Sequence, residues 1–253
     1  MDHAVVTRGE WIAARKTLLA REKELTRARD AVMAERLALP WVKLDKDYVF
    51  DTVDGKKSLG DLFNGRSQLI LKHFMMWPGR NDVCTGCAFE VDHVGGALVH
   101  LNHHDVSYVA VARAPLNEIE AVRKRMGWQI NWVSSFDSDF NYDFHVSFKP
   151  DEMKAAYYNF ETGPVPMSDL SGHSCFYRNE AGDIFHTYSA FGRGAEEVLT
   201  SYMYLDMAPL GRNEGAEKMS GWVRPHDKYA EGGHVDGMGQ YHAPKAGTCC
   251  SAD

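Results

Sequence analysis

The chain of 253 residues lacks any long apolar run and carries no excess of positive charge. No segment is long and apolar enough to span a bilayer, which argues against a membrane protein. With 28 Lys and Arg against 35 Asp and Glu, the net charge is -7, which disfavours binding to the phosphates of nucleic acids or of anionic membranes. We therefore expect neither nucleic acid nor a membrane as a partner.

Cysteine is also scarce, with five residues in the chain, and nothing near Met1 resembles a secretion signal. Residues 1–19 contain Asp, Arg, Glu and Lys and lack the apolar core of a signal peptide. Few cysteines without such a signal fit a reducing compartment better than a disulfide-stapled secreted domain. We therefore expect a cytoplasmic protein, whose 44% of hydrophobic residues suffice for a full core.

Two of the cysteines form a Cys-x-x-Cys pair behind the most apolar stretch of the chain. Residues 69–76 are almost wholly apolar, residues 77–83 form a loop, and Cys84 and Cys87 open a segment of helical character. This layout is typical of a thioredoxin-like redox site. The unpaired amides and partial positive charge of a helix N-terminus favour a thiolate there. The pattern predicts that Cys84 is the nucleophile and that Cys87 resolves the mixed disulfide.

Other interpretations of Cys84 and Cys87 remain open. The pair could be half of a zinc site or bind Cu(I), although the chain has no second Cys-x-x-Cys. It could reduce peroxide at Cys84, with Cys87 as the resolving partner. It could also be two inert buried residues. We expect a dithiol-disulfide oxidoreductase without a cofactor or bound metal, acting on a protein or small-molecule disulfide. A thiol peroxidase acting on peroxide and a non-catalytic copper or zinc module are the alternatives.

The order of strands and helices predicts an α/β domain. Strands at 69–76, 107–112 and 129–134 alternate with helices that begin at Cys84 and Pro115, which predicts parallel pairing at the centre of a sheet. Further elements are predicted as a hairpin of 41–44 with 48–50, a short helix over 150–157, a hairpin of 174–178 with 184–188, and a closing helix over 194–207. In the helix after Cys84 we expect Phe89 and Val91 to point inward and Glu90 outward.

The two ends of the chain differ from this domain. Apolar residues recur at helical spacing over 8–39, with Thr7 and Glu10 as a capping box. This helix would pack on its own domain or on a second copy, so a homodimer through it is possible. From Pro225 the composition is rich in Gly, His and Asp, which predicts a flexible tail. The predicted parts are a helical arm (1–40), a thioredoxin-like domain (41–223) and the tail (224–253).

Many short motifs carry a family resemblance. They are, in order, Arg66-Ser67-Gln68-Leu69, His73-Phe74-Met75, Cys84-x-x-Cys87, Arg113-Ala114-Pro115, Met126-Gly127-Trp128, Trp132-Val133-Ser134-Ser135, Asp139-Phe140-Asn141-Tyr142-Asp143, Phe185-His186-Thr187-Tyr188 and Leu205-Asp206. From about residue 11 to 224 the chain resembles the family catalogued as domain of unknown function 899. That resemblance implies a thioredoxin-like mixed sheet flanked by helices and a dithiol-disulfide oxidoreductase activity.

The element order is also similar to the alkyl-hydroperoxide-reductase branch of the thioredoxin superfamily, with two departures. Asn81 stands where that branch has a Thr or Ser three residues before its reactive thiol, and Pro78 is out of step. Thioredoxins place a cis-proline before the strand that follows the active site, whereas here His173 and Ser174 lead into Cys175. We therefore expect His173 or Ser174 to take the place of that proline, and His173 to border the site.

His73 occupies the place where thioredoxins carry a buried acidic residue. A neutral imidazole there could take the proton of Cys87 as a general base, or could be a core histidine bonded within the protein. Cys175 could be a third thiol, a soft metal ligand or a small buried apolar residue. The candidate catalytic residues are therefore Cys84, Cys87, His73 and His173.

Overall fold

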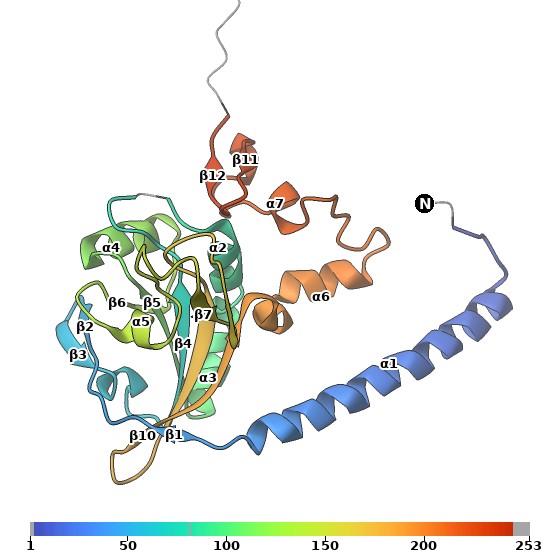
Figure 1. The fold of residues 1–253 in the computed structure, drawn as a ribbon. Helices are drawn as coiled ribbons and strands as arrows, with labels where there is room; N and C mark the ends of the chain where they lie inside the picture. The colour runs from blue at the N-terminus through green and yellow to red at the C-terminus, as the bar shows by residue number, and fades with distance from the viewer. Residues whose placement is uncertain (1–2, 81, 245–253) are drawn as a thin grey trace, which may run out of the picture. The chain divides into compact units, whose positions relative to one another are not determined.

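The computed structural model describes residues 3–80 and 82–244, which fall into two compact units, Met1–Trp41 and Val42–Asp253. The first unit contains one helix, α1 (Arg8–Leu37), and the predicted capping box is confirmed: Thr7 Oγ1 accepts from the Glu10 amide, and the Glu10 carboxylate accepts from the Thr7 amide (Figure 1). No residue of α1 is buried. A homodimer through this helix stays a prediction.

The second unit is built on one large sheet. Its strands lie in the order β1-β10-β9-β4-β5-β6-β2-β3. Their bounds are β1 (Val42–Lys43), β2 (Val49–Thr52), β3 (Gly55–Ser58), β4 (Gln68–Phe74), β5 (Val106–Ala112), β6 (Asn131–Ser134), β9 (Gly172–Arg178) and β10 (Ile184–Phe191). A separate small hairpin consists of β7 (Ala156–Tyr158) and β8 (Glu161–Gly163). The hairpin predicted for 174–178 with 184–188 is formed by β9 and β10.

The centre of the sheet confirms the predicted thioredoxin-like fold. Strands β4, β5 and β6 are parallel, β9 runs antiparallel to β4, and β10 runs antiparallel to β9. Helices connect β4 to β5 and β5 to β6, as the alternating sequence pattern predicted. The resulting order β10-β9-β4-β5, with the first crossover helix directly after β4, is the thioredoxin-like arrangement.

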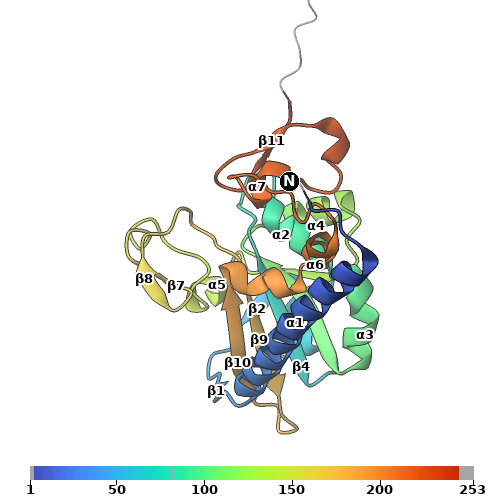
Figure 2. The ribbon, with the colours of Figure 1, turned by 90° about the vertical axis from the view of Figure 1, so that its right-hand side faces the viewer.

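Helices cover both faces of this sheet (Figures 1 and 2). The helical segments up to β10 are η1 (Asp61–Phe63), α2 (Thr85–Asp92), η2 (Gly95–Ala97), α3 (Leu98–His103), α4 (Leu116–Arg125) and α5 (Phe140–Asp143). The helix expected after Cys84 is interrupted after Asp92, and Gly95 and Gly96, each of which weakens a helix by about 1 kcal/mol relative to alanine, lie in η2 between α2 and α3.

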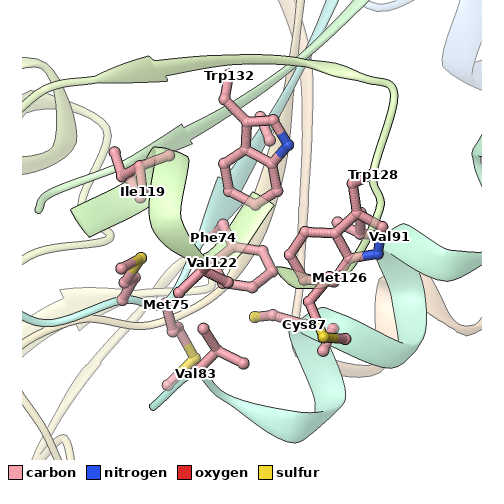
Figure 3. Close-up of a cluster of buried hydrophobic side chains, with 14 of the residues drawn as sticks. Phe74, Met75, Val83, Cys87, Val91, Ile119, Val122, Met126, Trp128 and Trp132 are labelled. Atoms are coloured by element: carbon pink, nitrogen blue, oxygen red, sulfur yellow. The ribbon is translucent and has the colours of Figure 1, made fainter. Parts of the chain in front are cut away.

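Two apolar clusters fill the space between sheet and helices. Successive strand residues point to opposite faces, so Ile70 and Phe74 of β4 join the cluster beneath α2 and α4, while Leu69 and Leu71 join the cluster beneath α5. The first cluster holds Cys87 among its buried side chains (Figure 3). The alternation of β4 therefore decides which of its side chains can approach the cysteine pair.

Several local predictions were wrong. Residues 41–50 form no hairpin, because β1 pairs with β10 and β2 pairs with β3 and β6. Residues 150–154 form turns that lead into β7, in place of the expected helix. The closing helix is split into η3 (Gly192–Val198) and α6 (Thr200–Met207), and Val198, expected inward, is 50% exposed.

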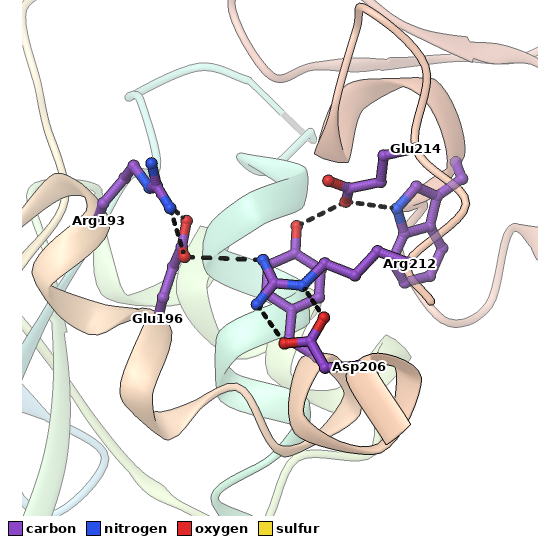
Figure 4. Close-up of polar contacts among 7 residues, drawn as sticks. Arg193, Glu196, Asp206, Arg212 and Glu214 are labelled. Carbon is purple, nitrogen blue, oxygen red and sulfur yellow. Dashed lines mark hydrogen bonds and ion pairs between the residues drawn. The ribbon is translucent and has the colours of Figure 1, made fainter. Parts of the chain in front are cut away.

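Residues 224–244 of the expected tail contain η4 (Tyr229–Glu231), β11 (His234–Val235) and β12 (Tyr241–His242), and α7 (Met219–Trp222) lies directly before them. A polar network connects α6 with α7: Glu214 accepts from Tyr202 and Trp222, and Arg212 pairs with Asp206 (Figure 4). Cys249 and Cys250 lie outside the described residues. None of the helices described here is long and apolar enough to cross a membrane.

Candidate functional site

The two cysteines lie where the sequence placed them, at the start of α2. Cys84 is the N-cap residue, with extended backbone angles (φ -60°, ψ 119°), and its carbonyl accepts the first helical bond from Ala88 at 3.0 Å. Cys84 is half-buried, whereas Cys87, in the first turn, is 2% exposed. Both are free thiols. The pair therefore has an outer, partly exposed cysteine and an inner one in the core.

The environment favours charge on the outer sulfur. The Cys87 thiol donates a hydrogen bond to Cys84, and this bond, helped by the amides of Cys87 and Gly86 and by the charge of Lys72, outweighs burial and lowers the pKa of Cys84 to about 7. The same bond, together with burial, raises the pKa of Cys87 well above its usual value. One cysteine is therefore ready to act as a thiolate near neutral pH while the other retains its proton.

A buried charged group lies beside the pair, and sequence reasoning missed it. Lys72 of β4 is fully buried, and its Nζ lies 2.6 Å from Glu90 Oε2 of α2. His173 lies opposite Lys72 on the neighbouring strand β9, and its Nε2 lies 2.8 Å from Glu90 Oε1. Glu90, expected to point outward, is only 5% exposed. That expectation was wrong because Glu90 follows Cys87 by three residues and so shares its face of the helix.

The ion pair stays charged in spite of its burial. Desolvation opposes the Glu90 carboxylate, but Lys72 and His173 outweigh it and hold the pKa of Glu90 at about 2. Desolvation likewise opposes the Lys72 ammonium, and Glu90 with the two cysteines outweighs it, so the pKa of Lys72 is raised. A permanent cation thus lies close enough to Cys84 and Cys87 to favour their thiolate forms.

His73 lies on the other face of the sheet. Its ring stacks on Phe140 and Phe144, and Nε2 lies 2.9 Å from the Ser174 hydroxyl. Because β4 alternates, Lys72 faces α2 and His73 faces away from it. The structure therefore does not bring His73 to Cys87, and its expected role as general base finds no support there.

The burial of His73 should make the stability of the fold depend on pH. Burial, together with the charges of His173 and Lys72, lowers the pKa of His73 to about 3. The unfolded chain binds a proton at about pH 6.5 and the folded protein does not. The free energy of unfolding should therefore fall by about 1.4 kcal/mol per pH unit below pH 6 because of this residue. Urea denaturation at pH 7, 6, 5 and 4 measures how the free energy of unfolding changes with pH. This slope should be shallower in His73→Leu than in the wild type, and equal slopes would contradict the prediction.

The start of β9 brings His173, but no proline, to the site. The described residues contain no cis peptide bond. Gly172 has no room for a side chain, because an added Cβ would lie 2.5 Å from the Phe191 ring. Cys175, two residues after His173, lies on the same face of β9.

Burial, Glu90, Cys87 and Cys175 raise the pKa of Tyr108, whose buried hydroxyl has no hydrogen-bond partner.

No group of three or more His, Cys, Asp or Glu side chains in residues 3–80 and 82–244 is placed to hold a metal ion.

Comparisons with known proteins identify the family. The sequence model of the family described as "Bacterial protein of unknown function (DUF899)" matches residues 1–229. No curated protein matches the chain. Similar solved structures include the peroxidoxin BcpB of Mycobacterium tuberculosis (12% identity, TM-score 0.41, 64% of this chain and 94% of that one). A peroxiredoxin Q mutant of Xanthomonas campestris is also similar (13% identity, TM-score 0.39, 63% of this chain and 91% of that one). So is thioredoxin peroxidase I of Plasmodium yoelii (16% identity, TM-score 0.38, 70% of this chain and 97% of that one).

Proposed function

Because the chain belongs to the DUF899 family of bacterial proteins, whose description assigns no activity, we propose its function from its own geometry: thiol-disulfide exchange through Cys84 and Cys87. The observation that carries the proposal is the asymmetry of the pair. The half-buried Cys84 has a lowered pKa and the buried Cys87 a raised one. Exchange needs this combination, since the thiolate is the attacking species and the second thiol must wait until the first has reacted.

The proposed reaction has two displacements. The Cys84 thiolate attacks one sulfur of a substrate disulfide, a Cys84–substrate bond forms, and the other substrate sulfur leaves as a thiolate. Cys87 then loses its proton and attacks Cys84, which forms the Cys84–Cys87 disulfide and releases the second substrate thiol. The substrate is reduced by two electrons and the protein dithiol is oxidised. The proton of Cys87 passes to a departing thiolate.

Lys72 is a positioning residue in this scheme. Its charge favours each thiolate in turn, first on Cys84 and then on Cys87. Glu90 is a poor general base, since a carboxylate with a pKa of about 2 binds protons weakly at neutral pH. Its part is to hold the Lys72 ammonium, whose Nζ lies 2.6 Å from Glu90 Oε2, and to contact His173 of β9 at 2.8 Å.

The pH dependence of alkylation tests the proposal. With iodoacetamide and mass spectrometry of the peptide that carries Cys84, the rate should follow a titration with a midpoint near pH 7. Cys87 in the same digest is the internal control, because its raised pKa keeps it unreactive over the same range. Below the midpoint Cys84 is protonated and the rate should fall about tenfold per pH unit. A midpoint at about 8.5, the value of an ordinary thiol, would contradict the proposal.

Activity assays separate exchange from the alternatives. The reduced protein should reduce a disulfide of a polypeptide such as insulin, and should form the Cys84–Cys87 disulfide as it does so. Rapid consumption of hydrogen peroxide, with little reaction toward disulfides, would instead indicate a thiol peroxidase. Stoichiometric copper or zinc in protein purified under reducing conditions would indicate a metal-binding module.

A further inference from the structure

The chain covers its own reactive thiol with a segment close to its C-terminal end. We name residues 234–242, which form β11, β12 and their connecting turn, the C-terminal hairpin (Figures 1 and 2). The Thr85 amide donates to the Gly239 carbonyl at 2.8 Å, and Cys84 and Gln240 form an isolated antiparallel bridge. A side chain placed on Gly239 would begin 3.5 Å from Cys84 Sγ. The backbone of the hairpin therefore lies directly against the sulfur.

A second contact fixes the hairpin beside the loop that precedes Cys84. The Arg80 guanidinium donates to Gln240 Oε1 and also pairs with Asp82 at 2.8 Å. Gln240 is 5% exposed and is the one buried residue between positions 226 and 244. The hairpin thus contributes a single buried polar side chain, and no buried apolar one, to the fold.

The C-terminal hairpin has little buried surface, whereas the chain just before it is anchored in an apolar cluster. Val223 is fully buried against Phe89 of α2, together with Leu199 and Tyr202. Beyond it, Gly232 and Gly233 have left-handed backbone angles, which glycine adopts without strain. A cavity of about 240 Å³ lies between the C-terminal segment and the loop at Val83. A two-stranded hairpin with so little buried surface is marginal on its own, so it can open while the rest stays folded.

We propose that the C-terminal hairpin occupies the place of a substrate polypeptide strand beside Cys84 and blocks the thiol until such a strand displaces it. This inference rests on the proposed function, and it names an extended polypeptide disulfide as the substrate. An extended polypeptide can offer the Thr85 amide the carbonyl that Gly239 now supplies, in antiparallel pairing. A small disulfide has no such strand, so it reacts only during spontaneous opening of the hairpin.

Gly239→Pro tests the inference in the full-length protein. Gly239 has a φ of +77°, and its amide donates to Asp236 at 3.0 Å; proline permits neither. The hairpin should then stay open. Alkylation of Cys84 by iodoacetamide at pH 7, and its reaction with a small aromatic disulfide, should accelerate at least about tenfold. Reduction of a polypeptide disulfide should change less, since that substrate displaces the hairpin in the wild type. Gly237→Ala, in the same turn with free space around it, is the matched control and should behave as the wild type.

The outcomes separate this inference from the proposed function. Unchanged alkylation of folded Gly239→Pro would overturn the inference and would leave exchange activity standing. Faster alkylation without exchange in either protein would support the covering role and overturn the proposed function. Equal acceleration of small and polypeptide disulfides would overturn the claim that a polypeptide displaces the hairpin. Should Gly239→Pro fail to fold, Gln240→Ala removes the buried side chain that accepts from Arg80; a smaller acceleration of alkylation supports the inference, and none overturns it.

Discussion

Replacing Cys84 by serine is expected to abolish exchange, with the rate of disulfide reduction falling about a thousandfold or more. Serine keeps the size of the side chain but cannot form the disulfide bond, and Cys87 is buried and retains its proton. Stopped-flow reduction of a polypeptide disulfide measures the loss. Cys87→Ser is the informative partner, because attack by Cys84 remains possible while resolution does not. We expect that variant to accumulate a mixed disulfide at Cys84, visible as an added mass.

Cys175→Ser is the control for this pair of variants. Cys175 is half-buried on β9 and takes no part in the proposed displacement. Its replacement should leave the exchange rate within about twofold of the wild type. If Cys175→Ser lost activity and Cys84→Ser kept it, the nucleophile would be misassigned. If Cys87→Ser turned over normally, a different thiol would have to resolve the intermediate.

Removal of the Lys72 charge is expected to have the largest effect on stability. Lys72→Met leaves the Glu90 carboxylate buried without its cation, and a broken buried pair costs about 3–5 kcal/mol. The double variant Lys72→Met with Glu90→Leu removes both charges and should recover most of that loss. Urea denaturation at pH 7 measures the three unfolding free energies. Lys57→Met is the control, because its partner Asp54 lies on the surface at 2.9 Å and the exposed pair should contribute no measurable stability.

The double variant also isolates the effect of Lys72 on the thiol. With the fold retained and the cation gone, the midpoint of Cys84 alkylation should move to higher pH, because Lys72 is one of the groups that lower the pKa of Cys84. A midpoint unchanged from the wild type would show that the Cys87 hydrogen bond and the helix amides suffice. Unchanged stability in Lys72→Met would mean that Glu90 is not buried as a charged group.

Local sequence patterns were sufficient for the centre of the fold. The strands β4 and β5 are almost continuous apolar runs, the hairpin of β9 and β10 flanks a clear turn, and Pro115 marks the start of α4. The pattern failed at β3, whose residues Gly55–Ser58 include two lysines and no apolar residue. That strand exists because it pairs with β2 at the edge of the sheet, and pairing of this kind leaves no apolar alternation in the sequence.

The candidate site could be predicted only in part. Cys84 and Cys87 were found from their spacing, and His173 from its place just before the strand expected at 174–178. Lys72 and Glu90 were missed, although each repeats the period of its element: Lys72 is two residues from Phe74, and Glu90 three from Cys87. The contacts of the C-terminal hairpin with Arg80 and Thr85 join positions about 155 to 160 residues apart, as the numbering shows. Local composition contains no signal for such contacts.

The complete burial of Lys72 sets this thiol apart from one activated by a surface lysine. Dissolved ions screen charges that they can approach, over a distance of about 8 Å at physiological ionic strength. Lys72 has no surface exposure, and its counter-charge Glu90 accompanies it in the interior. Its influence on Cys84 is therefore largely independent of the ionic strength outside, so the reactivity of the sulfur would persist from dilute to concentrated salt.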